Sequence, residues 1–138
     1  MEKILVPIDG SENSEKGLKY ACWLASKVGA TITVLYVVPI PLTGESAGFP
    51  IAPLEDVGQV ILDRAKEIVK DEKCVDADFV LRQGTGNPGH EIVSFSKENK
   101  ISLIVMSARG HTRLSHILIG SVSDMLTHHA PCPILIVR

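Results

Sequence analysis

Two glycines near the C-terminal end of the chain are placed where a phosphate group could bind. Gly110 and Gly120 have nine residues between them, and both follow an apolar run, residues 101–106. After Gly120 the chain takes up helical spacing, with one face made by Val122, Met125, Leu126 and His129. The start of a helix carries backbone N–H groups without partners and a partial positive charge, so an anion can bind there. Ser121, Arg109 and Arg113 would add a hydroxyl and positive charge to this predicted phosphate cradle.

A simpler interpretation of the same residues stays open. A glycine–serine pair before an apolar helical face is more often an ordinary helix start than a ligand site. The chain lacks the GxxxxGK[ST] pattern of a P-loop, and its first strand is not followed by GxGxxG. Residue types alone therefore favour the simpler interpretation over the phosphate cradle.

Strands and helices are expected to alternate along the whole chain. Apolar, often β-branched runs predict strands at residues 3–8, 31–38, 77–81, 101–106 and 134–137. Helical spacing predicts helices over residues 12–28 and 54–70, from Pro88 onward, and from Ser121 to near Ala130. This alternation predicts a single α/β domain over residues 1–138, with an open, doubly wound, five-stranded parallel sheet and four helices, in the Rossmann-like manner.

Helix ends and buried faces can also be predicted. Ser11 or Asp9 can cap the first helix, Gly29 can end it, and Asn87 can cap the third. Asp9 has a second interpretation as a ligand contact, because ligands of open α/β sheets bind where strands end. The buried faces are expected to consist of Leu18, Ala21, Leu24, Ala25 and Val28 in the first helix, and of Val57, Ile61, Ala65 and Ile68 in the second.

Residues 39–53 contain four prolines and two glycines and show neither helical nor strand periodicity. A long connection of this kind is usually a lid, a binding loop or a variable connector. Since it follows the second strand, it leaves the same sheet edge as the predicted cradle. A cover over the site and a plain connector are equally good interpretations.

Composition excludes several classes of protein. A formal net charge of −2 argues against a nucleic-acid-binding surface and gives no attraction to an anionic membrane. Four of the five histidines lie between His111 and His129, yet no cysteine or carboxylate stands beside them at ligand spacing, so solvated or packed histidines are expected. Three cysteines without a CxxC pair, and no apolar run of membrane-spanning length, indicate buried thiols in a reducing cytoplasm.

The chain resembles the universal stress protein (UspA-like) family. The family's nucleotide-binding motif is G-x2-G-x9-G-[ST], and Gly110, the nine residues 111–119 and Gly120-Ser121 match its second half. Ser107 occupies the position of the first glycine. The strand segments 5–9, 34–38 and 103–106 and the ending HAPCPILIV, residues 129–137, extend the resemblance over the whole chain.

The resemblance implies the strand order 3-2-1-4-5 and a site for ATP or AMP, with or without Mg²⁺. The residues that it assigns to nucleotide binding are Pro7, Ile8, Asp9, Val37, Met106, Ser107, Arg109, Gly110, His111, Gly120, Ser121 and Val122. Because serine is larger than glycine, Ser107 predicts weaker binding or a preference for AMP or ADP. The implied function is a stress-response regulator with at most weak ATPase activity.

The family also implies a homodimer formed through the last strand, residues 134–137, and protein partners that remain unknown. A nucleotide-free dimeric interaction module of the same family is the alternative function. An adenylyl-transferring enzyme is disfavoured, because the chain has neither a HIGH-type nor an SGGxDS-type motif.

Overall fold

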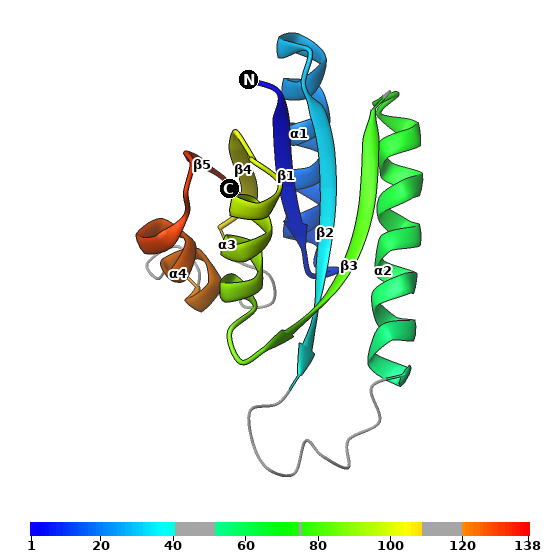
Figure 1. Ribbon diagram of the computed structural model, residues 1–138. Coiled ribbons are helices and arrows are strands. Elements are labelled where there is room, and N and C mark those ends of the chain that lie inside the picture. The colour runs from blue at the N-terminus through cyan, green and yellow to red at the C-terminus, as the bar shows by residue number, and fades with distance from the viewer. Residues whose placement is uncertain (41–51, 75, 109–119) are drawn as a thin grey trace.

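The computed structural model describes residues 1–40, 52–74, 76–108 and 120–138. In these ranges strands and helices alternate, as predicted (Figure 1). The elements are β1 (Lys3–Ile8), α1 (Glu12–Val28), β2 (Thr31–Ile40), α2 (Ala52–Asp71), β3 (Ala77–Thr85), α3 (Pro88–Glu98), β4 (Leu103–Ser107), α4 (Ser121–His129) and β5 (Ile134–Val137).

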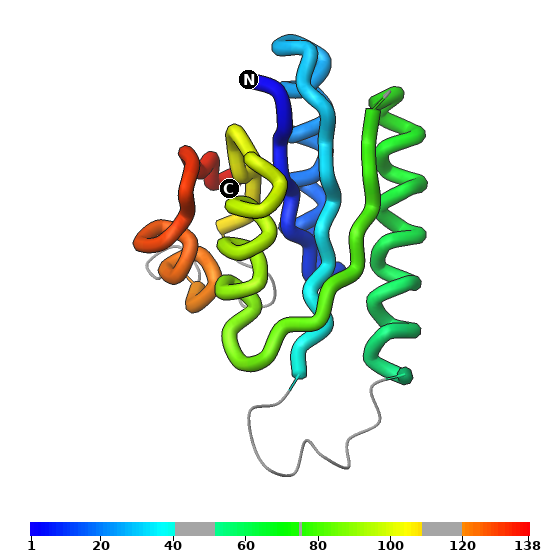
Figure 2. Tube along the Cα trace, viewed as in Figure 1, coloured from blue at the N-terminus to red at the C-terminus, as the bar shows by residue number. Residues whose placement is uncertain are grey.

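The five strands form one parallel sheet in the order β3-β2-β1-β4-β5, which confirms the predicted fold. β1 lies at the centre, between β2 and β4, and β5 is at one edge, as can be followed from blue to red in Figure 2. Along the chain, β2 and β3 are added on one side of β1, and β4 and β5 are then added on the other side. The order of the strands therefore reverses at β1. Ligands of open α/β sheets bind in the crevice at such a reversal.

Two apolar clusters cover the two faces of the sheet. Residues such as Val6 and Val34 point to one face, where α1 and α2 pack, whereas Leu5 and Leu35 point to the other, where α3 and α4 pack. All four of these side chains are fully buried. The near-continuous apolar strands thus follow from a sheet that is covered on both sides.

β2 and β3 are longer than predicted. They pair without interruption from Ile32 and Ala77 to Ile40 and Thr85, so residues 82–85, beyond the predicted end of the third strand at residue 81, belong to β3. Pro39 is tolerated in β2 because β1 ends earlier, at the level of Tyr36, and none of the described strands pairs with β2 on that side beyond this point. Pairing between the two strands therefore overrides the tendency of Pro39 and Gly84 to end a strand.

Smaller differences affect other boundaries. α2 begins at Ala52 rather than residue 54, and β4 begins at Leu103 rather than residue 101. The predicted cover, residues 39–53, lies mostly outside the described residues: 39 and 40 belong to β2, and 52 and 53 to α2.

The helix ends follow the predicted chemistry. Ser11 caps α1, because its Oγ accepts a hydrogen bond of 3.1 Å from the N–H of Ser14. Asn87 caps α3 in the same way, through the N–H of Gly89 at 2.8 Å. Gly29 ends α1 at a φ of 71°, a left-handed conformation that glycine adopts without steric cost.

Two predicted core residues are in fact exposed. Val28 is 44% and Val57 is 53% exposed. Val28 lies in the last turn of α1, beyond its buried face. In α2 the buried face runs along Gly58, Leu62, Ala65 and Val69, so that Val57 is rotated away from the sheet.

Candidate functional site

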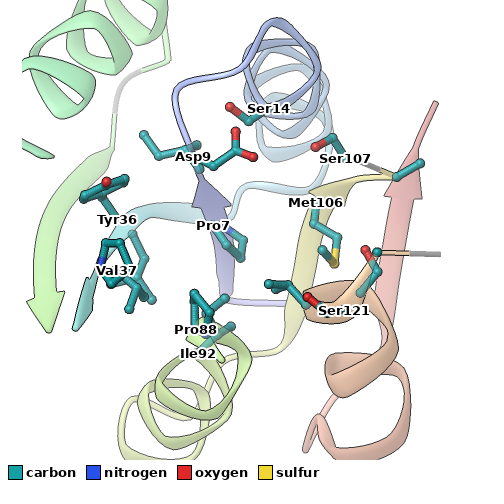
Figure 3. Close-up of a pocket in the computed structure, with 17 residues that line it drawn as sticks. Pro7, Asp9, Ser14, Tyr36, Val37, Pro88, Ile92, Met106, Ser107 and Ser121 are labelled. Carbon is teal, nitrogen blue, oxygen red and sulfur yellow. The ribbon is translucent and has the colours of Figure 1, made fainter. Parts of the chain in front are cut away.

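A cavity of about 470 Å³ lies at the carboxyl ends of β1, β2 and β4 and is closed on the opposite side by the starts of α3 and α4 (Figure 3). This is the crevice at the reversal of strand order. Its volume falls within the range of about 300–1,000 Å³ that is typical of small-molecule sites. The sheet therefore places a ligand-sized cavity where the sequence predicts one.

One wall of the cavity is apolar. Pro7, Val37 and Met106 come from three neighbouring strands and face the side of the sheet that α3 covers. Ile92 of α3 lies opposite them, as Figure 3 shows. These apolar side chains form a slot, and such a slot suits a flat, weakly polar ring.

Polar groups line another part of the cavity. Figure 3 shows Asp9, Ser14 and Ser107 close together there. The Oδ1 atom of Asp9 accepts a hydrogen bond of 2.9 Å from the N–H of Ser11, which ties the carboxylate to the turn before α1. The Ser14 hydroxyl donates to the carbonyl of Ser11 at 2.9 Å. The start of α1 therefore holds these groups at the cavity.

The start of α4 is open toward the same cavity. Gly120 is its N-cap, with φ −63° and ψ 162°, and no described side chain caps this helix. Gly120, Ser121, Val122 and Ser123 all line the cavity. The N–H groups of the first helical turn have no acceptor within the helix, and the helix dipole adds partial positive charge. This end of the cavity is therefore suited to an anion.

The position of α4 depends on α3. The Asn87 side chain, which caps α3, also donates through Nδ2 to the carbonyl of Ser121 at 3.3 Å. Gly89 allows the two helices to approach closely, because a Cβ there would lie 2.7 Å from Cγ of Met125. The open helix start is thus held by a side-chain hydrogen bond and by close packing.

Tyr36 also lines the cavity, although it was not among the predicted site residues. Tyr36 as a whole is 9% exposed, and its ring packs against Gly58 of α2. Burial raises the pKa of Tyr36, and the negative charge of Asp9 raises it further. The phenol therefore stays protonated at neutral pH and keeps its ability to donate a hydrogen bond.

The structure brings most of the predicted site residues together. Those that line the cavity are Pro7, Ile8, Asp9, Val37, Met106, Ser107, Gly120, Ser121 and Val122. Arg109, Gly110 and His111 lie outside the described residues.

The lining residues that the sequence analysis missed are Ser14, Leu35, Tyr36, Pro39, Pro88, Ile92, Ala108 and Ser123. Strand alternation could have found Leu35, which lies two residues before Val37. Nothing in the sequence signals Pro88 or Ile92, because they reach the cavity through the packing of α3 on the sheet.

The histidines, possible metal ligands and helix lengths bear on the other interpretations of the sequence. His128 and His129 are exposed on α4, as expected, and Nδ1 of His128 lies 3.6 Å from a carboxylate oxygen of Asp124. Nowhere in the described ranges do three potential metal ligands gather into one group. Of the helices described, none combines the length and the apolar character needed to cross a membrane.

Comparisons with known proteins give matches that extend over the whole chain. A sequence model of the universal stress protein family matches residues 1–138. The chain is 35% identical to universal stress protein YxiE of Bacillus subtilis (strain 168), over 99% of this chain and 98% of that protein.

Two solved structures share the fold. A universal stress protein from Archaeoglobus fulgidus in complex with dAMP aligns with a TM-score of 0.75 at 23% identity, over 100% of this chain and 98% of that one. A universal stress protein in complex with cAMP aligns with a TM-score of 0.76 at 22% identity, over 99% and 97% of the two chains.

Proposed function

Since the chain belongs to the universal stress protein family, we propose that it binds an adenine nucleotide, ATP or AMP, and acts as a stress-response regulator. The observation that carries this proposal is the shape of the cavity. An apolar slot lies beside a helix start whose N–H groups face the same space. A nucleotide has the matching chemistry, with a flat base at one end and an anionic phosphate at the other.

The lining residues suggest how a nucleotide is held. The base would lie in the apolar slot between Val37 and Met106, and Asp9 is the group suited to a ribose hydroxyl. The phosphate would bind at the N–H groups that follow Gly120. The hydroxyl of Ser107 could donate a hydrogen bond to a phosphate oxygen.

Similar structures support the ligand class. The two solved universal stress proteins were obtained with dAMP and with cAMP, each of which carries adenine and one phosphate group. AMP is therefore the first ligand to test here, and ATP the second. If Mg²⁺ accompanies the nucleotide, phosphate oxygens and water molecules would supply most of its ligands, because Asp9 is the one carboxylate among the described lining residues.

Calorimetry tests this proposal directly. Nucleotide released on denaturation of freshly purified protein should be identified by anion-exchange chromatography, and nucleotide-free protein titrated with AMP and with ATP, each with and without Mg²⁺. We expect a Kd in the micromolar range, about −8 kcal/mol, for at least one nucleotide. No released nucleotide and no binding heat would refute the proposal and favour the nucleotide-free interaction module.

We also propose that the protein forms a homodimer through the edge of β5 that no strand among the described residues covers. The N–H groups of Ile104, in β4, and of Ala108, which directly follows β4, donate to the carbonyls of Pro133 and Val137, each at 3.0 Å. Successive residues of a strand direct their N–H and C=O groups to opposite sides. Since the carbonyl of Val137 points toward β4, the N–H of Ile136 points away from it. An apolar edge strand with unpaired backbone groups is a ready surface for a second strand.

Replacing Ile136 with proline should therefore separate the dimer and keep the sheet. Proline removes an N–H that does not bond to β4. In a symmetric dimer the corresponding hydrogen bond is lost from both subunits. At roughly 0.5–1.5 kcal/mol for each of the two hydrogen bonds, the dimer dissociation constant should rise by about 5-fold to 150-fold. Sedimentation equilibrium measures the constant, and Ile136→Val is the matched control. An unchanged dimer with normal circular dichroism would contradict an interface at β5.

A reducing compartment fits the cysteines, which are free thiols at positions 22, 74 and 132. We propose the cytoplasm as the location of the protein. Fractionation of cells that produce the full-length protein would test this, with recovery in the membrane or periplasmic fraction as the contrary outcome.

A further inference from the structure

Two cysteines from different elements come together beneath the helices that cover one face of the sheet. Cys22, in the middle of α1, is 2% exposed and belongs to the core on that face. Cys74, which follows α2, is half-buried and packs against the same core. Cys132 packs against the core on the opposite face. The fold therefore pairs two of the three thiols and separates the third.

The end of α2 turns Cys74 toward the core. Lys73 has a φ of 55°, in the left-handed region, and its N–H donates to the carbonyl of Lys70 at 3.0 Å. The N–H of Cys74 reaches back to the carbonyl of Val69, also at 3.0 Å. This pair of hydrogen bonds is the Schellman motif, in which the residue at the position of Cys74 commonly makes an apolar contact with the preceding helix.

The two thiols share one apolar core, that between α1, α2 and the sheet, and Cys74 is among the neighbouring groups that act on the Cys22 thiol. Burial raises the pKa of Cys22 to about 12, and the neighbouring Cys74 and Glu72 add to the rise. Cys22 is therefore a protonated, unreactive thiol at neutral pH, whereas the more exposed Cys74 is the one that an oxidant reaches first.

We propose that Cys22 and Cys74 form a reversible disulfide when the protein meets a low-molecular-weight disulfide such as glutathione disulfide. The Cys74 thiolate attacks one sulfur of glutathione disulfide, forms a mixed disulfide and releases one glutathione thiolate. The Cys22 thiol then loses its proton to solvent, and its sulfur attacks that of Cys74, releasing the second glutathione thiolate. The protein loses two hydrogen atoms and two glutathione molecules are formed, so the exchange balances.

The second step should depend steeply on pH. Cys22 must be deprotonated to attack. The mixed disulfide at Cys74 should therefore accumulate near pH 7, and its conversion to the Cys22–Cys74 disulfide should become faster as the pH rises toward 9. In this range each pH unit increases the thiolate fraction about tenfold.

The disulfide would join α1 to the end of α2 at a distance from the nucleotide site. Ser14, the residue of α1 that lines the cavity, precedes Cys22 by eight residues, about 12 Å along the helix. The bond closes a long loop that contains β2 and α2, and this restricts the unfolded chain. We therefore expect oxidation to raise the melting temperature by on the order of 10 °C.

The experiment uses the full-length protein in a series of glutathione and glutathione disulfide ratios. Intact mass spectrometry should show the loss of two hydrogen atoms, and a non-reducing proteolytic map should show the peptides of Cys22 and Cys74 joined. Cys132→Ser is the matched control, since Cys132 is also half-buried and should leave the product unchanged. Cys74→Ser should abolish the joined peptide pair.

Two outcomes would overturn the proposal. One is a wild-type protein that stops at the mixed disulfide even at pH 9; the other is a joined pair that includes Cys132. Both are read from wild-type protein, so they do not depend on whether a variant folds. Failure of nucleotide binding would leave this result untouched, because the two sites are separate.

Discussion

Replacing Gly120 with aspartate should weaken AMP binding about 100-fold or more and leave the fold intact. Gly120 lines the cavity at the start of α4 and has an extended conformation that any residue can adopt. Aspartate is a favourable N-cap, so the helix should become slightly more stable, by a few tenths of a kcal/mol. Its carboxylate, however, would occupy the place of the phosphate. Two like charges about 5 Å apart repel by about 3 kcal/mol at an effective dielectric constant of 20.

Gly120→Asn separates charge from size. Asparagine caps a helix as well as aspartate does and has nearly the same volume, but it carries no charge. Calorimetric titration of both variants with AMP should show a much larger loss for aspartate, and the loss should shrink at high salt. Equal affinity of wild-type protein and Gly120→Asp would place the phosphate elsewhere and count against the cradle.

Replacing Gly58 with alanine should lower the free energy of unfolding by up to about 2 kcal/mol, although alanine is the better helix former. Inside α2 the exchange gains about 1 kcal/mol of helix propensity. A Cβ at this position, however, would lie 2.7 Å from Cδ1 of Tyr36 and 2.9 Å from Cδ1 of Leu81. Because the Tyr36 ring is buried, α2 must shift, and such overpacking costs about 1–3 kcal/mol.

Gly17→Ala is the matched control for this prediction. Gly17 lies inside α1, and a Cβ there would be 3.4 Å from the nearest atom, the backbone nitrogen of Ser107. This is close to an ordinary contact, so helix propensity should decide the result, and Gly17→Ala should be as stable as wild type or more so. Urea denaturation measures both variants. A stabilised Gly58→Ala variant would show that α2 packs on Tyr36 less closely than the structure indicates.

The elements and the principal site residues could be predicted because their signals are local. Runs such as Leu103–Met106 must be buried on both faces, and caps such as Ser11 and Asn87 act within one helical turn. Gly120-Ser121 was identified in the same way, from a helical pattern and a family motif. The strand order came only from the resemblance to the family, since local patterns do not specify which strands become neighbours.

The missing parts of the site depend on contacts between distant segments. Pro88 and Ile92 reach the cavity because α3 packs across β2 and β3, and the ring of Tyr36 fits against α2 because Gly58 leaves room for it. In the same way, pairing of β2 with β3 carried both strands through Pro39 and Gly84. Local propensities amount to about 1 kcal/mol for a residue, whereas a continuous strand ladder and a close-packed core act on many residues at once. Thus periodicity and capping residues decided which elements form, and tertiary packing decided how far they extend and which side chains share the cavity.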